Sequence, residues 1–462
     1  MEQHQQYDLI VIGSGPAGQK GAIAAAKAGK RVVIIDKKTM VGGVSLHRGT
    51  IPSKTLREVI IYLSGLRQRA FYGDNYKVKQ EISTDDLASR VELVEQREMD
   101  VVYDQLYRNG IQLIYGMARF VDQHTVEVEK SDGIERLQGE HFLIACGTRP
   151  ASNPEIPFDG ETIIDVDQIL NLKQMPKRMI IVGAGVIGLE YGSMFSAMGV
   201  EVTLIDHNSL LLPFVDEQIM DELMIHLENQ GTIFRLAEKV EKVEKNDQGL
   251  VRVQLESGFE FEAETFLYAV GRQANSDTLN LEVLNIEADE RGRINVNENF
   301  QTKVSHIYAA GDVVGFPALA ASSMEQGRLA SCHMFNAPAD YRPHLLPYGI
   351  YTIPEISMVG KTEQELLDQR IPYAIGKSKF VELARGGIMG IETGMLKILF
   401  DPESHKLLGV HIIGETATEL IHIGQTVISF GGTIEYFRDT VFNYPTLAEA
   451  YKVAALDGLN RL

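Results

Sequence analysis

The sequence predicts an α/β protein in which one strand, glycine loop, helix and strand unit occurs twice, followed by a separate α+β domain. Two segments carry the repeat: DLIVIGSGPAGQKGAIAAAKAGKRVVIIDK from Asp8 and RMIIVGAGVIGLEYGSMFSAMGVEVTLIDH from Arg178. The chain has 462 residues, and because one hydrophobic core cannot grow that large, roughly two to four domains are expected. From about Pro347 shorter strands take over and the glycine loop is missing.

The two segments share a set of glycines and a terminal acid, namely Gly13, Gly15, Gly18, Gly29 and Asp36 in the first and Gly183, Gly185, Gly188, Gly199 and Asp206 in the second. The first glycine permits a tight turn after a buried strand, the second lets the backbone approach a pyrophosphate, and the third lets helix and strand pack closely. The helix N-terminus favours phosphate, and the acid can accept a hydrogen bond from a ribose 2′-OH. The repeat therefore predicts two Rossmann-like dinucleotide-binding domains, between which we expect electrons to pass.

Between the copies, residues 83–110 show a helical pattern in which Ser83 and Asp86 have the spacing of a capping box. Its apolar residues on one face indicate ordinary core packing; they are Leu87, Val91 and Val94. IACGTRP (144–150) and YAVGRQAN (268–275) each place a glycine after an apolar strand. They are consistent with crossings between domains, although each alone is also typical of a plain exit from a strand.

The C-terminal part has a different pattern. MLKILF (395–400) and LLGVHIIG (407–414) flank the turn-rich DPESHK, which predicts a β-hairpin. ETATELIHIGQTVIS (415–429) follows as an amphipathic helix. We interpret this part as an α+β association domain.

Composition excludes several classes of function. The formal net charge of -19 argues against a nucleic-acid surface, which needs clustered Lys and Arg, but leaves room for a local site for a phosphate ligand. The only cysteines, Cys146 and Cys332, exclude a disulfide scaffold, and His405, His411 and His422 lack the HxxxH spacing, so no metal site is expected. The opening lacks a basic region of a signal peptide, and no stretch approaches the roughly 20 apolar residues of a membrane helix, so we expect a cytoplasmic protein without membrane contact.

Four motifs in order, namely GGVSLHRGTIPSK (42–54), the paired glycine segments, YAAGDVVG (308–315) and FNYPTLAEA (442–450), resemble the pyridine nucleotide-disulfide oxidoreductase family. Dihydrolipoyl dehydrogenases and glutathione reductases belong to it. The resemblance runs from about Tyr7 to Leu462 and implies an FAD domain interrupted by a nicotinamide-nucleotide domain, then an interface domain that makes a homodimer or a higher homo-oligomer. We expect the FAD domain at 1–155 and 276–345, the NAD(P)-binding domain at 156–275 and the dimerisation domain at 346–462.

The resemblance also implies roles for particular residues. It places the FAD pyrophosphate on the loop from Gly13 to Gly18, the adenosine ribose on Asp36 and the ribityl chain on Asp312. The helix that begins near Leu319 would point its N-terminus at the flavin pyrimidine. Lys54 would lie near flavin N5 and pair with Glu190, while Gly183, Gly185, Gly188 and Asp206 would hold the nicotinamide nucleotide.

Two departures from the family pattern bear on the chemistry. Ser45 and Thr50 stand where the reductases have Cys-x4-Cys, and hydroxyls neither form a disulfide nor provide a thiolate. Tyr444 stands where the reductases carry the His before Pro-Thr, although Glu449, the usual partner of that His, remains. Because tyrosine titrates near a pH of about 10, it is a poor base at neutral pH. Both departures remove the half-reaction that reduces a disulfide.

The remaining half-reaction is hydride transfer between a nicotinamide and flavin N5. If no thiol drains the flavin, the hydride can return to a second nicotinamide, which is a ping-pong exchange. GTIPSK, YTIPEIS, IHIGQ, FNYPT and GLNRL are also similar to those family members that exchange hydride between NADP(H) and NAD(H). We therefore expect FAD-dependent hydride transfer between NADPH and NAD⁺, with NADPH oxidation as the physiological direction.

The sequence leaves some alternatives open. Asp206 favours a free 2′-OH, and no Arg or Lys follows it within several residues. His207, Asn208 and Ser209 either donate to a 2′-phosphate or are plain loop residues in a chain that prefers NAD(H). The first rival is thus an NADH-dependent diaphorase that passes electrons to a quinone, a dye or oxygen. The second rival is a sensor that keeps the fold without turnover.

Overall fold

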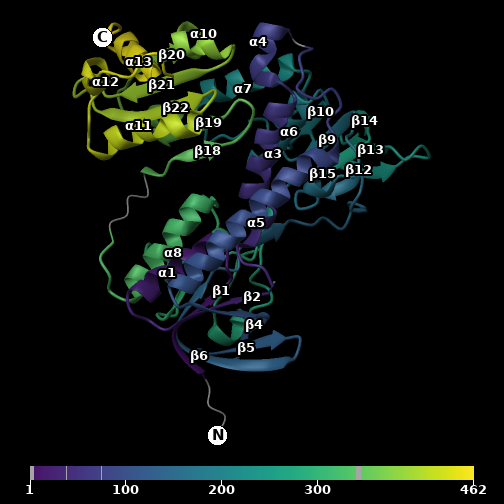
Figure 1. Ribbon diagram of the computed structural model, residues 1–462, viewed down its shortest axis with the longest axis vertical. Helices are drawn as coiled ribbons and strands as arrows, with labels where there is room; N and C mark the ends of the chain where they lie inside the picture. Colours follow the sequence, from purple (N-terminus) through teal and green to yellow (C-terminus); the bar gives the residue numbers. More distant parts are fainter. Residues whose placement is uncertain (1–4, 38, 74, 340–344) are drawn as a thin grey trace. The chain divides into compact units, whose positions relative to one another are not determined.

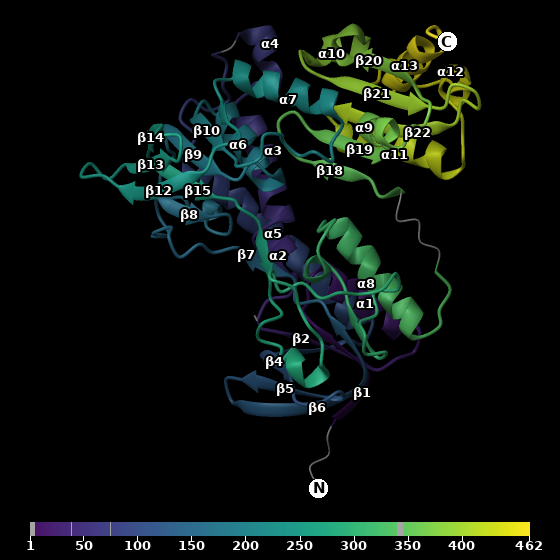
Figure 2. The ribbon, with the colours of Figure 1, turned by 180° about the vertical axis from the view of Figure 1, so that it is seen from behind.

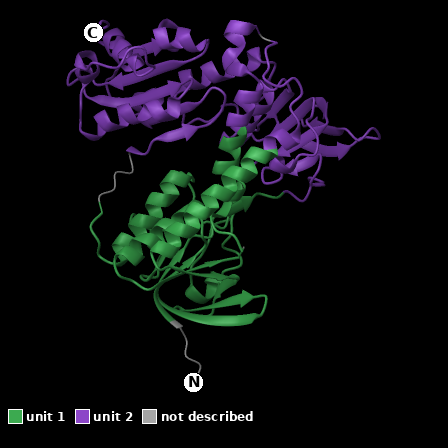
Figure 3. Cartoon of the chain, viewed as in Figure 1, with its two compact units in different colours: residues 1–56, 88–152, 271–341 green, residues 57–87, 153–270, 342–462 purple. Residues whose placement is uncertain are grey.

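The computed structural model describes residues 5–37, 39–73, 75–339 and 345–462 (Figure 1). The first four residues, part of the opening considered for a signal peptide, lie outside this description. The chain forms two compact units (Figure 3): unit 1 contains residues 1–56, 88–152 and 271–341, and unit 2 contains residues 57–87, 153–270 and 342–462. No helix in the described ranges is long and apolar enough to cross a membrane.

Unit 1 is built on a seven-stranded sheet in the order β3-β2-β1-β6-β5-β4, with β17 paired to β6. The strands β3, β2, β1, β6 and β17 run parallel, whereas β4 and β5 pair antiparallel. The strands are β1 (Gln5–Ile12), β2 (Val32–Asp36), β3 (Gln112–Tyr115), β4 (Met117–Phe120), β5 (Thr125–Lys130), β6 (Gly133–Ile144) and β17 (Ile307–Ala309). Two further short strands, β7 (Thr148–Pro150) and β16 (Arg272–Ala274), pair antiparallel.

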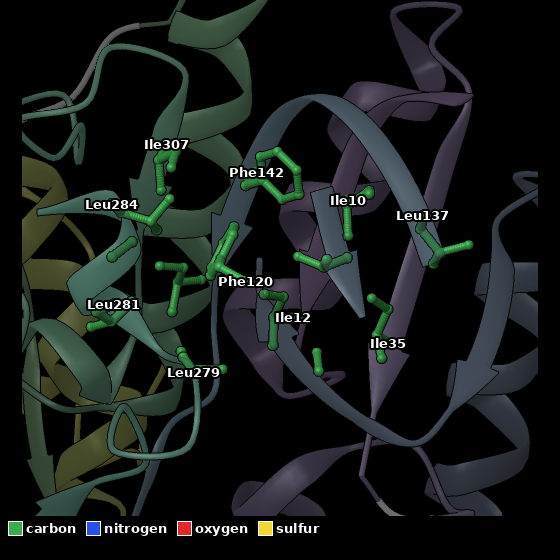
Figure 4. Close-up of a cluster of buried hydrophobic side chains, with 14 of the residues drawn as sticks. Ile10, Ile12, Ile35, Phe120, Leu137, Phe142, Leu279, Leu281, Leu284 and Ile307 are labelled. Atoms are coloured by element: carbon green, nitrogen blue, oxygen red, sulfur yellow. The ribbon is translucent and has the colours of Figure 1, made fainter. Parts of the chain in front are cut away.

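Helices α1 (Pro16–Lys27) and α8 (Ala320–Met334) lie side by side on this sheet (Figure 1). They touch through backbone, because a Cβ added to Gly327 would lie 2.0 Å from the carbonyl oxygen of Ala17. On the other side of the sheet, Phe142 packs edge-on against Phe120, with ring centroids 5.1 Å apart, inside a large apolar cluster (Figure 4). The apolar runs of the sequence predict strands that are buried on both faces, and this sheet has that arrangement.

The first part of unit 2 is a parallel sheet in the order β11-β10-β9-β15-β8. A three-stranded antiparallel sheet packs against it through an apolar cluster that contains Ile180 and Ile205. The strands are β8 (Ile163–Asp165), β9 (Arg178–Val182), β10 (Glu201–Ile205), β11 (Ile233–Arg235), β12 (Val240–Lys245), β13 (Val251–Leu255), β14 (Glu260–Ala263) and β15 (Thr265–Tyr268), and the helices are α6 (Val186–Ala197) and α7 (Glu217–Asn229).

The second part of unit 2 is an antiparallel sheet in the order β18-β19-β22-β21-β20. Helix α11 packs along β19 and β22, and α13 along β20 and β21 (Figure 2). The elements are β18 (Tyr348–Ile350), β19 (Ile356–Gly360), α9 (Glu363–Asp368), β20 (Ala374–Lys379), α10 (Ala384–Met389), β21 (Met395–Phe400), β22 (Leu407–Ile413), α11 (Ala417–Ser429), α12 (Glu435–Asp439) and α13 (Glu449–Leu459). The predicted hairpin and amphipathic helix are confirmed.

The remaining helices are α2 (Gly43–His47), α3 (Thr50–Leu63), α4 (Arg69–Tyr72) and α5 (Thr84–Arg108). The predicted capping box of α5 is confirmed: Ser83 N donates to Asp86 Oδ2 at 2.8 Å, and Asp86 N donates to Ser83 Oγ at 3.3 Å. Leu87 and Val91 are buried, and Val94 is half-buried. The predicted α/β class with two Rossmann-like parallel sheets and a C-terminal α+β part is likewise confirmed.

A buried cluster of charged side chains ties the two parts of unit 2 together. Lys397 of β21 is 1% exposed, and its Nζ lies 2.9 Å from both carboxylate oxygens of Asp216, which directly precedes α7. The same Nζ lies 2.5 Å from Glu363 Oε2 at the start of α9, and Tyr373 OH donates to Glu363 Oε1 at 2.9 Å. The sequence interpretation did not identify this cluster.

Candidate functional site

The glycine loop between β1 and α1 has the geometry of a phosphate cradle. Gly13 has φ +108°, and a Cβ there would lie 2.3 Å from Ala145 O. A Cβ on Gly18 would lie 1.9 Å from Gly13 O, so helix and strand are in contact at this point. A Cβ on Gly15, in contrast, would meet no atom within 4 Å. The loop is thus closed toward the protein and open in front of Gly15, where the N-terminus of α1 begins.

The loop between β9 and α6 repeats this construction. Gly183 has φ +99°, and a Cβ there would lie 2.6 Å from Ala269 O. A Cβ on Gly188 would lie 1.9 Å from Gly183 O, and a Cβ on Gly185 would meet nothing within 4 Å. Two loops 170 residues apart in number therefore offer the same open space to a pyrophosphate.

The two acids at the strand ends brace their own loops, a role that the fingerprint did not predict. Asp36 Oδ2 accepts hydrogen bonds from Ser14 N at 2.8 Å and from Ser14 Oγ at 2.6 Å. Asp206 Oδ2 accepts one from Ala184 N at 2.7 Å. Each acid thus holds the residue after the first glycine of its own loop.

The second oxygen of Asp206 is also engaged. Its Oδ1 accepts hydrogen bonds from Asn208 N at 2.8 Å and from Asn208 Nδ2 at 2.9 Å. His207 Nδ1 lies 3.4 Å from the same oxygen. The Asn208 carboxamide, considered from sequence as a donor to a 2′-phosphate, is therefore turned toward Asp206.

An arginine that is far from Asp206 in the sequence lies on β11, the strand next to β10. Arg235 is the last residue of β11, and its carbonyl accepts a hydrogen bond from Asp206 N at 3.0 Å. Its guanidinium carbon lies over the rings of Phe259 and Phe261, 4.8 and 5.4 Å from their centroids. The stacking places this cation against the β12–β14 sheet.

The motif that lacks cysteines lies against the first glycine loop. Gly42 N donates to Ser14 O at 3.2 Å, and a Cβ on Gly43 would lie 2.9 Å from the Cα of Gly15. Helix α2, which carries Ser45, therefore starts beside the open space of the cradle. Ser45 is half-buried.

Helix α3 carries the other two residues of the motif. Thr50 begins the helix and is half-buried, and so is Lys54 one turn later. Lys54 Nζ donates to Ser53 Oγ at 3.2 Å. Ser45, Thr50 and Lys54 thus belong to unit 1 together with Asp36 and the first loop.

Asp312 lies at the end of a relay of hydrogen bonds within unit 1. Arg272 donates from Nε to Thr148 Oγ1 at 2.8 Å and from Nη2 to Thr148 O at 3.0 Å. Since a guanidinium can only donate, the Thr148 hydroxyl is left to donate to Asp312 Oδ2, 3.2 Å away. Ser323 Oγ lies 3.4 Å from the other oxygen, Oδ1. The crossing strands β7 and β16 therefore orient the acid of the predicted ribityl site.

Glu190 is fixed within unit 2. It lies on α6, is 4% exposed, and accepts a hydrogen bond through Oε1 from Tyr351 N at 2.9 Å. Ile353 N donates to Ser193 Oγ one turn further along α6, at 3.0 Å. Burial, with the nearby charge of Glu190, raises the pKa of Tyr348 to about 12. The segment YTIPEIS (351–357) thus fixes the Glu190 carboxylate through the backbone of Tyr351. The sequence pointed to this segment only through its resemblance to the family.

The two remaining candidates lie in the C-terminal part of unit 2. Tyr444 is 72% exposed in the single chain, and Glu449 is the half-buried first residue of α13. No contact between their side chains is identified within the described part of the chain.

The two cysteines, Cys146 and Cys332, do not form a disulfide. Both thiols are free; Cys146 follows β6 and Cys332 is buried in α8. Burial raises the pKa of the Cys146 thiol to about 12, which disfavours the thiolate. His411 contacts Lys361 O, His405 the Glu435 carboxylate, and His422 the Gln425 side chain. Among the residues described, no group of three or more His, Cys, Asp or Glu is arranged to hold a metal ion.

Known proteins and family profiles match nearly the whole chain. The profile of the family described as pyridine nucleotide-disulphide oxidoreductase matches residues 7–327, and that of its dimerisation domain matches residues 346–455. A protein named soluble pyridine nucleotide transhydrogenase from Mycobacterium tuberculosis (strain ATCC 25177 / H37Ra) is 51% identical over 460 residues, covering 99% of this chain and 98% of its own length. A protein of the same name from Erwinia tasmaniensis is 45% identical over 469 residues and is covered completely, as is this chain.

Solved structures agree in fold. LpdA from Mycobacterium tuberculosis has a TM-score of 0.90 at 25% sequence identity, with 98% of this chain and 99% of that chain covered. The HOCl-induced flavoprotein disulfide reductase RclA from Escherichia coli has a TM-score of 0.87 at 27% identity, with 97% and 99% covered. The fold is thus common to proteins that carry different names.

Proposed function

The chain belongs to the pyridine nucleotide-disulphide oxidoreductase family, and from this premise we propose that it transfers hydride between NADPH and NAD⁺ through FAD. The observation that carries the proposal is the pair of cradles, each closed behind its first and third glycines and open at Gly15 or Gly185. Relatives at 45–51% identity that carry the transhydrogenase name support the same reaction. FAD, when bound, supplies a carrier that accepts and returns one hydride at N5.

The residues of the chain then bind and orient the partners. The loop from Gly13 to Gly18 binds the FAD pyrophosphate, Asp36 the adenosine ribose and Asp312 the ribityl chain. Lys54 is the cation near flavin N5, and Glu190 is the carboxylate that balances it. Gly183, Gly185, Gly188 and Asp206 hold NAD(H) or NADP(H).

A reaction without protein thiols follows from the residues in the motif. Ser45 and Thr50 leave no disulfide to accept electrons, and Tyr444 stands in place of the His that would act as base toward a dithiol. Nicotinamide is then both donor and acceptor. No metal takes part in the proposed reaction.

Replacing both cysteines, Cys146→Ser and Cys332→Ser, is expected to leave hydride exchange within about twofold of the wild-type rate, because the raised thiol pKa of Cys146 and the burial of Cys332 make these sulfurs unreactive. Steady-state turnover and the flavin spectrum during anaerobic titration with NADPH measure the effect. Loss of turnover in a variant that still binds FAD and keeps its melting temperature would show that a redox thiol takes part.

Thr148→Val is expected to weaken FAD binding about tenfold, since the isosteric side chain removes the donor to Asp312 while filling the same volume. Thr148→Ser, which keeps the hydroxyl, is the matched control and should bind FAD nearly as the wild type does. Titration of apoprotein with FAD, followed by flavin fluorescence, gives both dissociation constants. Equal affinities of the Val and Ser variants would mean that the relay does not orient Asp312.

The test of the reaction itself is reduction of a thio-analogue of NAD⁺ by NADPH with purified protein, followed at the absorbance of the reduced analogue. Turnover supports the proposal. Rapid dye reduction by NADH without turnover of the analogue in either direction favours the diaphorase. A colourless protein that cannot be reconstituted with FAD favours the sensor.

Assembly and location are part of the proposal. The match to a dimerisation domain indicates a homo-oligomer, and we propose a homodimer or a higher homo-oligomer in the cytoplasm, without nucleic-acid or membrane partners. We also propose the domain division 1–155 with 276–345, 156–275 and 346–462. Mass measurement by light scattering during size-exclusion chromatography tests the oligomeric state.

A further inference from the structure

One nucleotide site in the proposed reaction must accept a ribose with a free 2′-OH and a ribose with a 2′-phosphate. Sites for NAD usually present a free carboxylate, and sites for NADP usually present an arginine. The loop after β10 contains Asp206 without an arginine, and Arg235 on the next strand is stacked on two phenylalanine rings. What remains to be explained is how an acid at this position tolerates a phosphate.

The contacts of Asp206 provide the explanation. Its carboxylate accepts three hydrogen bonds from protein N–H groups, one from Ala184 N and two from Asn208. An ionised carboxylate has about four acceptor positions, so most of its capacity is used inside the protein. The side chain is only 11% exposed. Little of the carboxylate is left either to select a 2′-OH or to repel a phosphate.

Two of the three bonds cannot be changed by the side chains of the loop, because they come from backbone amides. The third comes from the carboxamide of Asn208, which is itself exposed. Among these three donors, Asn208 is therefore the residue whose side chain determines how much of the Asp206 carboxylate is available to a bound ribose. His207, 61% exposed, and Ser209, also exposed, lie on the same loop and offer donors to either form of the nucleotide.

We propose that Asn208 is a specificity-determining residue of the nicotinamide-nucleotide site: its carboxamide occupies Asp206 Oδ1 and so lets one pocket accept both NAD(H) and NADP(H). The inference rests on the proposed function, since it assumes that both nucleotides use this site. It assigns Asp206 mainly to bracing the loop through Ala184. Removing the carboxamide frees one acceptor on Asp206, which binds a 2′-OH more strongly and a 2′-phosphate more weakly.

The experiment measures binding of two nucleotide fragments, ADP-ribose and 2′-phospho-ADP-ribose, to the oxidised FAD-loaded protein by calorimetry. Since neither fragment carries nicotinamide, the readout does not depend on turnover. Asn208→Ala is expected to shift the ratio of the two dissociation constants about tenfold toward ADP-ribose, the effect of one hydrogen bond to a charged group. Asn208→Leu, which keeps more of the volume, should give the same shift if the Ala variant does not fold.

Two further variants test the route of the effect. Asp206→Asn should shift the ratio toward the phosphorylated fragment, and in the double variant Asp206→Asn with Asn208→Ala the effect of the Asn208 substitution should vanish. Asn246→Ala is the matched control: in the same unit its Nδ2 also donates to a carboxylate, Glu262 Oε1 at 3.0 Å, and its removal should leave the ratio unchanged.

The outcomes separate the inference from the proposed function. A ratio that stays within about twofold in both Asn208 variants, or a shift that persists in the double variant, overturns the role of Asn208. The expected shifts without NADPH-driven reduction of the NAD⁺ analogue support the role of Asn208 and overturn the reaction. If the wild type binds neither fragment, both proposals fail.

Discussion

Gly185→Ala is expected to give a yellow, stable protein whose dissociation constants for NADH and NADPH are raised about 10- to 100-fold. The backbone of Gly185, with φ -72° and ψ -174°, suits alanine, and the added Cβ meets no protein atom within 4 Å. Only a ligand at the loop would collide with the methyl group and lose its bonds to the backbone N–H groups. Stopped-flow reduction of the flavin over a range of nucleotide concentrations gives both constants.

Gly15→Ala tests the first cradle in the same way, but here FAD binding should fall and nucleotide binding should be kept. Its Cβ also meets no protein atom, so the variant should fold but purify with little FAD, while ADP-ribose still binds at the second loop. Gly387→Ala, in α10, adds a methyl group into equally open space and should change neither ligand. Normal FAD content in Gly15→Ala, or unchanged nucleotide affinity in Gly185→Ala, would contradict the assignment of the cradles.

Local patterns predicted the two loops because their turns and their helix contacts lie close together in sequence, although the close approaches of Gly13 to Ala145 and of Gly183 to Ala269 are long-range. The turn at Gly13, the open position at Gly15 and the contact at Gly18 depend on a few consecutive residues and on one following helix. The same locality made the β21–β22 hairpin and the helix α11 predictable. The site of hydride transfer is less local, and there the sequence indicated residues through resemblance alone.

The contacts that orient the site join residues far apart in the chain. Thr148 meets Arg272 only because β7 and β16 pair antiparallel, and Glu190 meets Tyr351 only after β18 is in place. The sequence did mark both crossing segments by a glycine after a strand, but that signal does not say which side chains will meet. In both copies the acid accepts a hydrogen bond from the residue 22 positions before it, Ser14 for Asp36 and Ala184 for Asp206. The glycine fingerprint, however, assigns this acid only the role of binding a ribose.

The buried cluster in unit 2 does have a signal in the sequence. Lys397 lies in the otherwise apolar MLKILF, and a charged side chain inside a buried strand requires a partner. The partner, Asp216, ends the loop that begins with Asp206. This loop is thus held at its start by Ala184 and at its end by Lys397.

Asp216→Ala is expected to lower the free energy of unfolding by about 3–5 kcal/mol, because it leaves the Lys397 ammonium buried with one acid fewer. Asp216→Leu combined with Lys397→Met, which replaces the pair by apolar side chains, should recover most of the loss. Lys242→Met is the matched control in the same unit: its pair with Glu244 is solvent-exposed, so this variant should unfold at nearly the same urea concentration as the wild type. Urea unfolding followed by circular dichroism at neutral pH compares the four proteins.

The pH dependence of the same variants distinguishes charge from packing. Burial alone would raise the pKa of Asp216, but His411 when protonated and the hydrogen-bonded Lys397 hold it below its ordinary value. A carboxyl with a depressed pKa in the folded state stabilises the fold above its unfolded pKa of about 3.9, and this contribution is lost as the pH falls below that value. The difference in stability between wild type and the Leu and Met double variant should therefore move in favour of the double variant below a pH of about 4, whereas a difference independent of pH would mean that Asp216 acts through shape and not through charge.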